Sequence, residues 1–317
     1  MKEKENKPDL SIQLMDELNL KNPVMTASGT FGYGEEYSDY IDLNKIGAVI
    51  VKGISLEPRE GNPPPRIIET PCGMLNSIGL ANVGIDTFIH EKLPFLKKFN
   101  TKVIVNIYGE RIDQFEKLAE MLNSVDGVHG VELNISCPNV QKGGIAFGAD
   151  PSLAFDITRA VRKKTHLPLI VKLTPNVTDI SEIALAVENA GADAVSLINT
   201  LKGMSIDVEK RIPHLKNIIG GLSGPAIRPI AVRMVWEVAK RVSIPIIGIG
   251  GIMTSRDALE FLIAGASAVQ IGTAHFVNPR IIEDVLGGIE DYLQRHGFLK
   301  VGDLTGSLEN RSSGYYC

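Results

Sequence analysis

The sequence predicts an α/β fold, a (β/α)8 TIM barrel with an N-terminal hairpin and insertions on its C-terminal face. Short runs rich in Val and Ile alternate with amphipathic stretches along the chain, as in parallel sheets whose strands are joined by helices. There are eight such runs, which is the number of strands that closes a barrel of this kind. Barrels commonly reach the 317 residues found here as one folded unit.

Each apolar run has the length of a strand and is followed by polar or glycine-rich sequence. The eight runs are Pro23 to Ala27, Ala48 to Val51, Val103 to Val105, Gly130 to Leu133, Leu169 to Val171, Ala194 to Leu197, Pro245 to Ile249 and Ala268 to Ile271. Apolar residues recur at helical spacing in Ile112 to Leu122 and in Pro151 to Lys164. Asp150 before Pro151 is a typical N-cap followed by a proline at the first helical position.

Three segments depart from a plain strand and helix repeat. Ser11 to Leu20 alternates apolar residues around Asp16-Glu17, which predicts a hairpin that seals the bottom of the barrel. The connections from Ile54 to about Lys102 and from Asn199 to Pro229 are too long for turns. Insertions on this side of a barrel form the substrate pocket.

Composition and charge exclude several classes of protein. The chain has 33 Lys and Arg against 37 Asp and Glu, so no overall positive field attracts nucleic acid or an anionic membrane. The charged N-terminus lacks the apolar core of a secretory signal, and no apolar run reaches the roughly 18 residues of a membrane span. We therefore expect a cytoplasmic protein that acts on small molecules.

Cysteines and histidines show no metal-binding pattern. Cys72, Cys137 and Cys317 lack C-x-x-C spacing, which argues against a disulfide framework, a structural zinc site or an iron–sulfur cluster held by this chain. The six histidines lack ligand spacing as well, so we expect no catalytic metal. His275 follows the eighth strand, and we expect it at the ordinary surface, with the pocket rim as the alternative.

A polar residue or glycine follows every predicted strand, at the end where catalytic groups gather in barrels. These residues are Ser28, Lys52, Asn106, Asn134, Lys172, Asn199, Gly250 and Gly272. Strands that simply give way to polar loops would explain any one of them, but not two lysines and three asparagines together. Lys52 and Lys172 follow apolar runs, which indicates a bound anion unless their ammonium groups extend into solvent.

Glycines follow the last two strands. Gly248-Ile-Gly-Gly251 precedes a helix expected to begin near Ser255, and Gly272-Thr273 follows the eighth strand. Bare backbone amides and a helix N-terminus at these places bind phosphate in many barrels. Such a phosphate belongs either to a substrate or to a nucleotide such as a flavin mononucleotide, and the alternative is that the glycines are turn residues.

The segment Asn134 to Asn139, N-I-S-C-P-N, closes the fourth strand with a thiol between two amides. A thiolate can act as a base or a nucleophile, and asparagine amides suit a flat, imide-like ring. Gly143-Gly144 and Gly148 predict a flexible loop that carries the thiol. The alternative is that Cys137 is a small buried apolar residue.

Taken together, these motifs resemble those of class I dihydroorotate dehydrogenases, FMN-containing α/β barrels of pyrimidine biosynthesis. The resemblance covers nearly the whole chain. It depends on P-V-M-T-A-S-G-T-F from Pro23 to Phe31, Val51-Lys52-Gly53, N-S-I-G-L-A-N from Asn76 to Asn82, Asn134 to Asn139, and the glycine cradle. Cys-Pro-Asn-Val from Cys137 and G-L-S-G-P-A from Gly221 to Ala226 are most similar to the NAD-linked class IB.

The resemblance implies an activity and a partner. It implies that (S)-dihydroorotate is oxidised to orotate in UMP biosynthesis, with one FMN per chain as hydride acceptor. Electrons would pass to NAD+ through a partner subunit holding FAD and a [2Fe-2S] cluster, in a heterotetramer of two catalytic and two electron-transfer subunits. Alternatives are a fumarate-linked class IA-type enzyme, a phosphate-binding barrel isomerase or aldolase with a Schiff base at Lys172, and an inactive ligand-binding barrel.

The resemblance also implies roles for individual residues within 1–308, a single FMN-binding barrel domain. Residues 309–317 are polar and show no periodicity, so we expect a disordered tail there. FMN would be held by Ser28, Lys52, Gly53, Asn106, Asn134, Lys172, Ile198, Gly224, Gly250, Gly251, Gly272 and Thr273. Orotate would be held by Lys52, Asn76, Ser77, Ile78, Gly79, Leu80, Asn134, Asn199 and Thr200, with Asn139 as an addition. Cys137 would be the catalytic base, a position at which the membrane-bound class carries serine.

Overall fold

The centre of the molecule is a closed barrel of eight parallel strands that pair in chain order. The computed structural model describes residues 7–136 and 147–309. The barrel strands are β3 (Val24–Thr26), β4 (Ala48–Ile50), β7 (Lys102–Ile107), β8 (Gly130–Asn134), β9 (Leu169–Lys172), β10 (Ala194–Leu197), β15 (Ile246–Ile249) and β16 (Ala268–Ile271). Each of the eight predicted strands is confirmed, and so is the TIM-barrel class.

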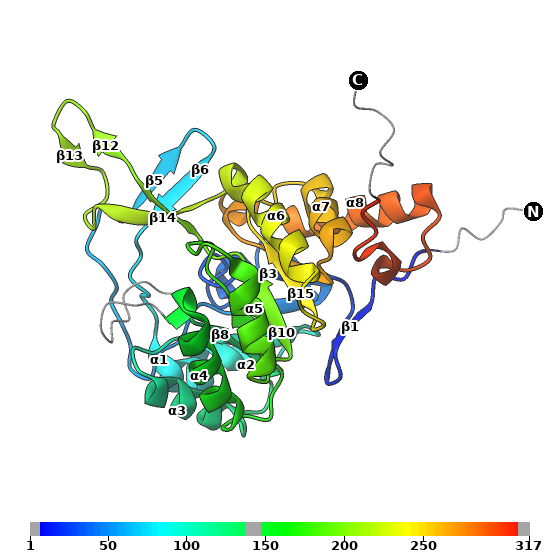
Figure 1. The fold of residues 1–317 in the computed structure, drawn as a ribbon, viewed down its shortest axis with the longest axis horizontal. Coiled ribbons are helices and arrows are strands. Elements are labelled where there is room, and N and C mark those ends of the chain that lie inside the picture. The colour runs from blue at the N-terminus through cyan, green and yellow to red at the C-terminus, as the bar shows by residue number, and fades with distance from the viewer. Residues whose placement is uncertain (1–6, 137–146, 310–317) are drawn as a thin grey trace, which may run out of the picture.

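Helices connect the strands and cover the outside of the barrel (Figure 1). They are α1 (Gly84–Thr87), α2 (Leu93–Leu96), α3 (Ile112–Leu122), α4 (Pro151–Arg162), α5 (Ile180–Asn189), α6 (Arg228–Ala239), α7 (Ser255–Ala264) and α8 (Ile281–His296). Shorter helical turns are η1 (Glu35–Tyr37), η2 (Leu43–Lys45), η3 (Phe88–Lys92), η4 (Phe147–Ala149), η5 (Pro225–Ile227), η6 (Thr273–Phe276) and η7 (Val301–Leu304). No helix in the described part of the chain is both long and apolar enough to cross a bilayer.

The amphipathic pattern of the sequence explains how the helices pack. In α3, Phe115, Leu118 and Leu122 share one face and are buried against the barrel. In α4, the Asp150 side chain accepts a hydrogen bond of 3.0 Å from the Leu153 amide, and Pro151 occupies the first turn. Both predicted helices and the predicted cap are confirmed.

One end of the barrel is closed by the N-terminal hairpin, as predicted. Strands β1 (Ile12–Met15) and β2 (Leu18–Leu20) pair antiparallel. Leu14, Leu18 and Leu20 of this hairpin are buried. They pack against the inward-facing residues Met25, Ala48, Ile50, Ile104, Ile170, Ala194, Ile247 and Ala268. This half of the barrel interior is therefore apolar.

The interior becomes polar toward the other end of the barrel. Side chains in a strand alternate between its two faces, so the next inward-facing residue lies two positions further along. Two positions after Ile104, Ile170, Ala194 and Ala268 come Asn106, Lys172, Ser196 and Gln270. All four are buried, and they form a polar layer beneath the ends of the strands.

The two long connections meet above the barrel as one antiparallel sheet, which confirms insertions on this face. The strand order is β11 (Leu201–Met204), β14 (Ile219–Ser223), β6 (Gly73–Asn76) and β5 (Ile67–Thr70). Strands β12 (Ile206–Asp207) and β13 (Ile212–Pro213) form a projecting tip (Figure 1). The Asn76 side chain donates to the Gly221 carbonyl at 3.3 Å, so segments distant in sequence lie side by side.

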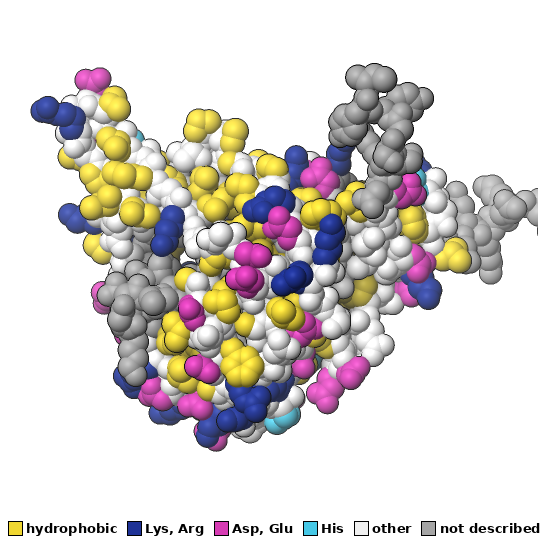
Figure 2. Space-filling model, viewed as in Figure 1, with side chains coloured by type: hydrophobic (Ala, Val, Ile, Leu, Met, Phe, Trp, Pro, Cys, Tyr) yellow, Lys and Arg dark blue, Asp and Glu magenta, His cyan; other side chains and the backbone are white. Residues whose placement is uncertain are grey.

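The projecting insertion, which we call the arm, covers residues 201–223. Apolar side chains gather on it in the space-filling view (Figure 2). Its exposed apolar residues are Met204, Ile206, Val208, Ile212, Ile218 and Ile219. Monomeric proteins rarely expose large contiguous apolar patches, so such a surface is typical of a contact with another protein.

Candidate active site

A cavity of about 790 Å3 lies at the carboxyl ends of the barrel strands, beneath the inserted sheet. This volume is within the range of roughly 300–1,000 Å3 that is usual for small-molecule sites. All eight residues predicted at the strand ends line it. They are Ser28, Lys52, Asn106, Asn134, Lys172, Asn199, Gly250 and Gly272.

The other candidate residues also line this cavity where the structure describes them. They are Gly53, Asn76, Ser77, Ile78, Gly79, Leu80, Ile198, Thr200, Gly224, Gly251 and Thr273. Cys137, Asn139 and Gly143-Gly144 lie outside the described residues. The predicted tail is also outside them, apart from Glu309.

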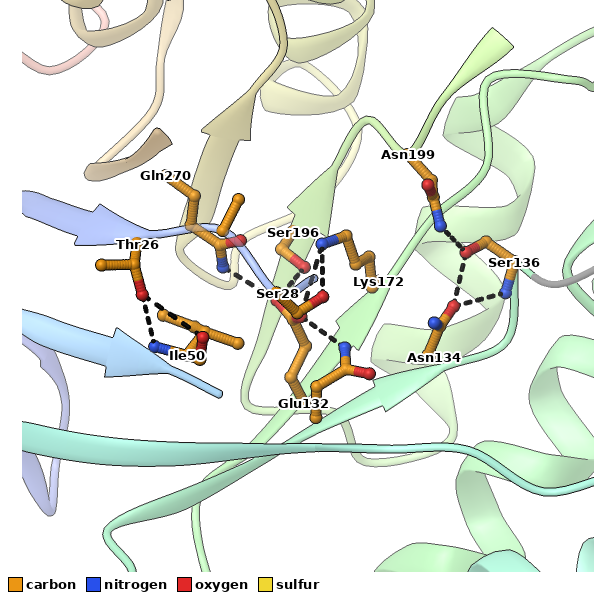
Figure 3. A network of polar contacts seen from close by, with 12 residues as sticks. Thr26, Ser28, Ile50, Glu132, Asn134, Ser136, Lys172, Ser196, Asn199 and Gln270 are labelled. Atoms are coloured by element: carbon orange, nitrogen blue, oxygen red, sulfur yellow. Dashed lines mark hydrogen bonds and ion pairs between the residues drawn. The ribbon is translucent and has the colours of Figure 1, made fainter. Parts of the chain in front are cut away.

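The floor of the cavity is built around Glu132, which sequence reasoning did not select. Its fully buried carboxylate accepts hydrogen bonds from Ser196 (2.9 Å) and Gln270 (2.8 Å) (Figure 3). It also accepts a hydrogen bond from Asn106 (2.7 Å). The feature of the sequence that could have identified Glu132 is a single carboxylate at an inward-facing position of an otherwise apolar strand. Such a residue needs polar partners, because an unpaired charge in an apolar interior is strongly unfavourable.

Lys172, at the end of β9, carries its charge to the cavity wall. Its ammonium lies 3.5 Å from Glu132 Oε1 and 3.3 Å from Ser28 Oγ (Figure 3). The side chain is almost completely buried. The alternative that Lys172 extends into solvent is therefore wrong.

Lys52 is the second ammonium group of the cavity, and it is half-buried. Burial, followed by the positive charge of Arg66, lowers the pKa of Lys52 below its ordinary value of 10.5, while Glu36 opposes the shift. Arg66 also lines the cavity. Two cations on one wall favour an anionic ligand, because an opposite charge would relieve both their desolvation and their mutual repulsion.

Amide side chains on β8 and beyond β10 are connected through Ser136. Ser136 Oγ donates to Asn134 Oδ1 at 2.6 Å, and the Asn199 side-chain amide donates to Ser136 Oγ (Figure 3). The Thr200 amide donates to Asn199 Oδ1 at 2.7 Å. These contacts fix the orientation of two carboxamides that face the cavity.

The glycines near the last two strands bring backbone segments into close contact. Gly224, Gly250 and Gly251 have φ values of 95°, 132° and 71°, a region that side chains rarely adopt. A Cβ atom at Gly251 would lie 2.7 Å from the Gly224 carbonyl oxygen and 2.9 Å from Arg228 Cβ. The cradle therefore presents bare backbone, as required for close approach to a phosphate.

The N-terminus of α7 contributes less to this cradle than the glycine pattern suggested. Asp257 Oδ2 accepts from the Met253 amide (2.9 Å) and the Thr254 amide (2.8 Å). Thr254 Oγ1 accepts from the Asp257 amide in return, which completes a capping box. These three amides are therefore already bonded within the chain.

Two buried oxygen atoms of cavity residues lack a partner among the described residues: Asn106 Oδ1 and Ser77 Oγ. Asn106 Oδ1 lies 2.8 Å from the point that a Cβ at Gly53 would occupy. Buried polar atoms are nearly always hydrogen-bonded, so these atoms indicate a ligand with donors. The imide N–H of a flavin ring, together with a phosphate at the glycine cradle, fits this arrangement.

His275 differs from its prediction. Its side chain is only 1% exposed and it does not line the cavity, so both the surface and the pocket rim were wrong. It packs edge-on against Phe31 and Tyr37, and its Nδ1 lies 3.0 Å from the Gly272 carbonyl oxygen. Burial lowers the pKa of His275 to about 4, and the hydrogen bond to Gly272 partly opposes this.

A family model described as dihydroorotate dehydrogenase matches residues 10–293. The chain belongs to the dihydroorotate dehydrogenase family. The resemblance inferred from the motifs is thereby confirmed, and the protein is an enzyme of the oxidoreductase class.

Relatives within the dihydroorotate dehydrogenase family share most of the sequence. A protein of Geotalea daltonii named dihydroorotate dehydrogenase B (NAD(+)), catalytic subunit, is 60% identical over 303 residues, which cover 96% of this chain and 99% of that protein. The protein of the same name from Geotalea uraniireducens is 59% identical over 302 residues, covering 95% and 99%. That from Geobacter sulfurreducens is 57% identical over 303 residues, covering 96% and 99%.

Proposed function

We propose that this protein oxidises (S)-dihydroorotate to orotate in the synthesis of UMP, with FMN as its resident cofactor. The observation that carries the proposal is that every described residue matched to an FMN or orotate contact lines one cavity. The names of relatives that are 57–60% identical to this chain support the same substrate. When bound, FMN supplies the acceptor for the hydride that leaves C6 of the substrate.

The polar floor and the glycine cradle are suited to hold FMN at its two ends. Asn106 Oδ1 is a buried acceptor without a described partner, which suits the imide N–H of the ring. Lys172 brings a buried positive charge to the same region, which would stabilise negative charge on the pyrimidine part of the ring. Gly250, Gly251 and Gly272-Thr273 would contact the ribityl phosphate.

Lys52 and the asparagine amides are suited to hold the substrate. The lowered pKa of Lys52 arises from burial and from Arg66, so a bound carboxylate would favour the charged ammonium and oppose this lowering. Asn134 and Asn199 are oriented by Ser136 and would bond to the imide edge of orotate. The loop Asn76 to Leu80 would cover the ring from the inserted sheet.

Cys137 would serve as the catalytic base. Formation of the C5=C6 double bond requires that C5 loses a proton and C6 loses a hydride with its electron pair. A thiolate at Cys137 would take the C5 proton, and general bases of this kind contribute roughly 10²–10⁴-fold to rate. Asn134 and Asn199 would keep the ring in position for both transfers.

Electrons would leave through a partner subunit with FAD and a [2Fe-2S] cluster, toward NAD+. The words "catalytic subunit" in the relatives' names support a second kind of subunit. Phe276 lines the cavity and is 52% exposed, and the adjacent Val277 is 73% exposed, so the cavity mouth has an apolar border suited to docking. The apolar arm would serve assembly into a heterotetramer of two catalytic and two electron-transfer subunits.

Reconstitution with candidate acceptors tests the electron route. The chain is purified alone and together with an iron–sulfur flavoprotein from the same cell, and dihydroorotate oxidation is assayed with NAD+ and with fumarate. We expect NAD+ reduction only in the presence of the partner, and no fumarate reduction. Fumarate turnover by the chain alone would instead assign the class IA-type reaction.

A further inference from the structure

Glu132 is connected to the cavity without lining it. Its carboxylate receives side-chain contacts from four other barrel strands. They come from Lys172 on β9, Ser196 on β10 and Gln270 on β16 (Figure 3), and from Asn106 on β7. The barrel therefore closes around one buried negative charge. Removal of this charge would affect groups on both sides of the cavity floor.

The two oxygen atoms of Glu132 contact different kinds of residue. Oε1 accepts from Asn106 Nδ2 at 2.7 Å and lies 3.5 Å from Lys172 Nζ, and both of these residues line the cavity. Oε2 accepts from Ser196 Oγ at 2.9 Å and Gln270 Nε2 at 2.8 Å, and neither of these lines it. Oε1 is therefore the atom that influences the ligand site.

The contact through Oε1 determines which way the Asn106 amide faces. An ionised carboxylate only accepts hydrogen bonds, so Asn106 must turn its NH2 group toward Glu132. Its oxygen atom then remains at the cavity wall beside Gly53, buried and without a partner among the described residues. A neutral amide at position 132 would no longer enforce this orientation, because an amide both donates and accepts.

Glu132 Oε1 also offsets the charge of Lys172. Among the described residues, Lys172 forms an ion pair with Glu132 and with no other carboxylate. Both side chains are almost fully excluded from water, so their interaction is weakly screened. Loss of the carboxylate would leave an uncompensated ammonium group at the cavity floor, which would favour an electron-rich ligand.

We propose that Glu132 is a positioning residue that sets the affinity and the reduction potential of the flavin. It does so by fixing the Asn106 amide with its oxygen toward the cavity and by offsetting the Lys172 charge. This inference rests on the proposed function, because it requires FMN in the cavity. Ser196 and Gln270 hold the carboxylate in place from the other side.

The variant Glu132→Gln tests both effects, because it keeps the shape of the side chain and removes its charge. FMN affinity is measured by titration of apoprotein, and the potential by equilibration with a reference dye. We expect binding of oxidised FMN to weaken about tenfold, as for loss of one buried hydrogen bond. We expect the potential to rise by about 30 mV, which corresponds to a tenfold change in preference for the two-electron reduced form.

Ser196→Ala is the matched control, since it removes a contact to Oε2 and leaves both contacts to Oε1. We expect a lower melting temperature with an unchanged potential. A rise in potential equal to that of E132Q would contradict the proposal, because general loosening of the floor would then explain both variants. An unchanged or lower potential in E132Q would contradict it as well.

A double variant covers the case in which E132Q does not fold, since removing one partner of a buried ion pair is strongly destabilising. In E132Q/K172M both charges are absent. Its potential is compared with that of K172M, in which Glu132 lacks its cation but keeps the hydrogen bonds from Asn106, Ser196 and Gln270. We expect the double variant to have the higher potential, and equal potentials would contradict the proposal. Wild-type protein that fails to bind FMN would refute the proposed function itself. If wild-type protein binds FMN and the variants have the same affinity and potential as wild type, only the role of Glu132 is refuted.

Discussion

The Asn199 side-chain amide donates a hydrogen bond to Ser136 Oγ, which joins the end of β10 to the end of β8. Ser136 in turn donates to Asn134 Oδ1 at 2.6 Å. Ser136 is also the residue before Cys137 in the sequence. One hydroxyl group therefore orients both carboxamides assigned to the substrate and precedes the assigned base.

Ser136→Ala is expected to weaken orotate binding about tenfold, because Asn134 and Asn199 lose their shared partner and one buried hydrogen bond is worth about 1 kcal/mol or more. Binding is measured by titration of the flavin spectrum with orotate. Ser38→Ala is the control, since Ser38 Oγ bonds to the Glu35 carbonyl on the surface. Wild-type affinity in Ser136→Ala would show that the amides do not need this hydroxyl group.

Cys137→Ala is expected to retain FMN and to slow flavin reduction by dihydroorotate by roughly 100-fold or more, the usual effect of losing a general base. The measurement is the anaerobic, single-turnover loss of flavin absorbance. Cys72→Ala, at an exposed position, should reduce its flavin at the wild-type rate. A wild-type rate in Cys137→Ala would refute the assignment of the base.

Lys52→Ala is expected to weaken orotate binding more than it changes the melting temperature. The half-buried ammonium of Lys52 is the group proposed to meet the substrate carboxylate, and a charge-assisted hydrogen bond of this kind is worth about 1.5–3 kcal/mol. Isothermal titration with orotate gives the affinity. Lys163→Ala, at an exposed position after α4, should bind like wild type, and equal affinities in the two variants would argue against the role of Lys52.

Stability is expected to fall in acid because His275 is buried. Its pKa in the folded state, about 4, is below its ordinary value of 6.5, so between these values the unfolded chain binds more protons than the folded chain. The free energy of unfolding that the neutral, buried His275 contributes is therefore fully present above pH 6.5. It is lost as the pH falls toward 4, up to about 3 kcal/mol.

Urea unfolding of wild type and His275→Asn at pH 7.5 and pH 5 measures this effect. Asparagine keeps a donor for the Gly272 carbonyl but does not titrate in this range. We expect the difference in unfolding free energy between the two pH values to be smaller in the variant. An identical difference in both proteins would assign the acid sensitivity to other groups.

Much of the fold was predictable because it depends on local patterns. The alternation of apolar runs with helical periodicity located the barrel strands and α3, and the short side chain of Asp150 before Pro151 located the start of α4. The residues at the strand ends were predictable for the same reason. Once the strands are parallel and the barrel closes, their carboxyl ends must meet on one face.

The floor of the cavity was not predictable, because it depends on contacts between distant strands. Glu132 has partners 26, 64 and 138 positions away in the sequence, at Asn106, Ser196 and Gln270. No local pattern in Gly130–Asn134 identifies them. His275 was misplaced for a similar reason, since the aromatic side chains that enclose it come from Phe31 and Tyr37 near the opposite end of the chain.

Anaerobic titration of the purified, FMN-loaded protein with dihydroorotate is the most direct test of the central claim, that one cavity of this chain joins FMN to dihydroorotate. We expect the absorbance of oxidised flavin to disappear in proportion to added substrate, with one orotate formed per flavin, and orotate alone to perturb the spectrum without bleaching it. A colourless protein that does not take up FMN, or bound flavin that dihydroorotate leaves oxidised, would contradict the claim.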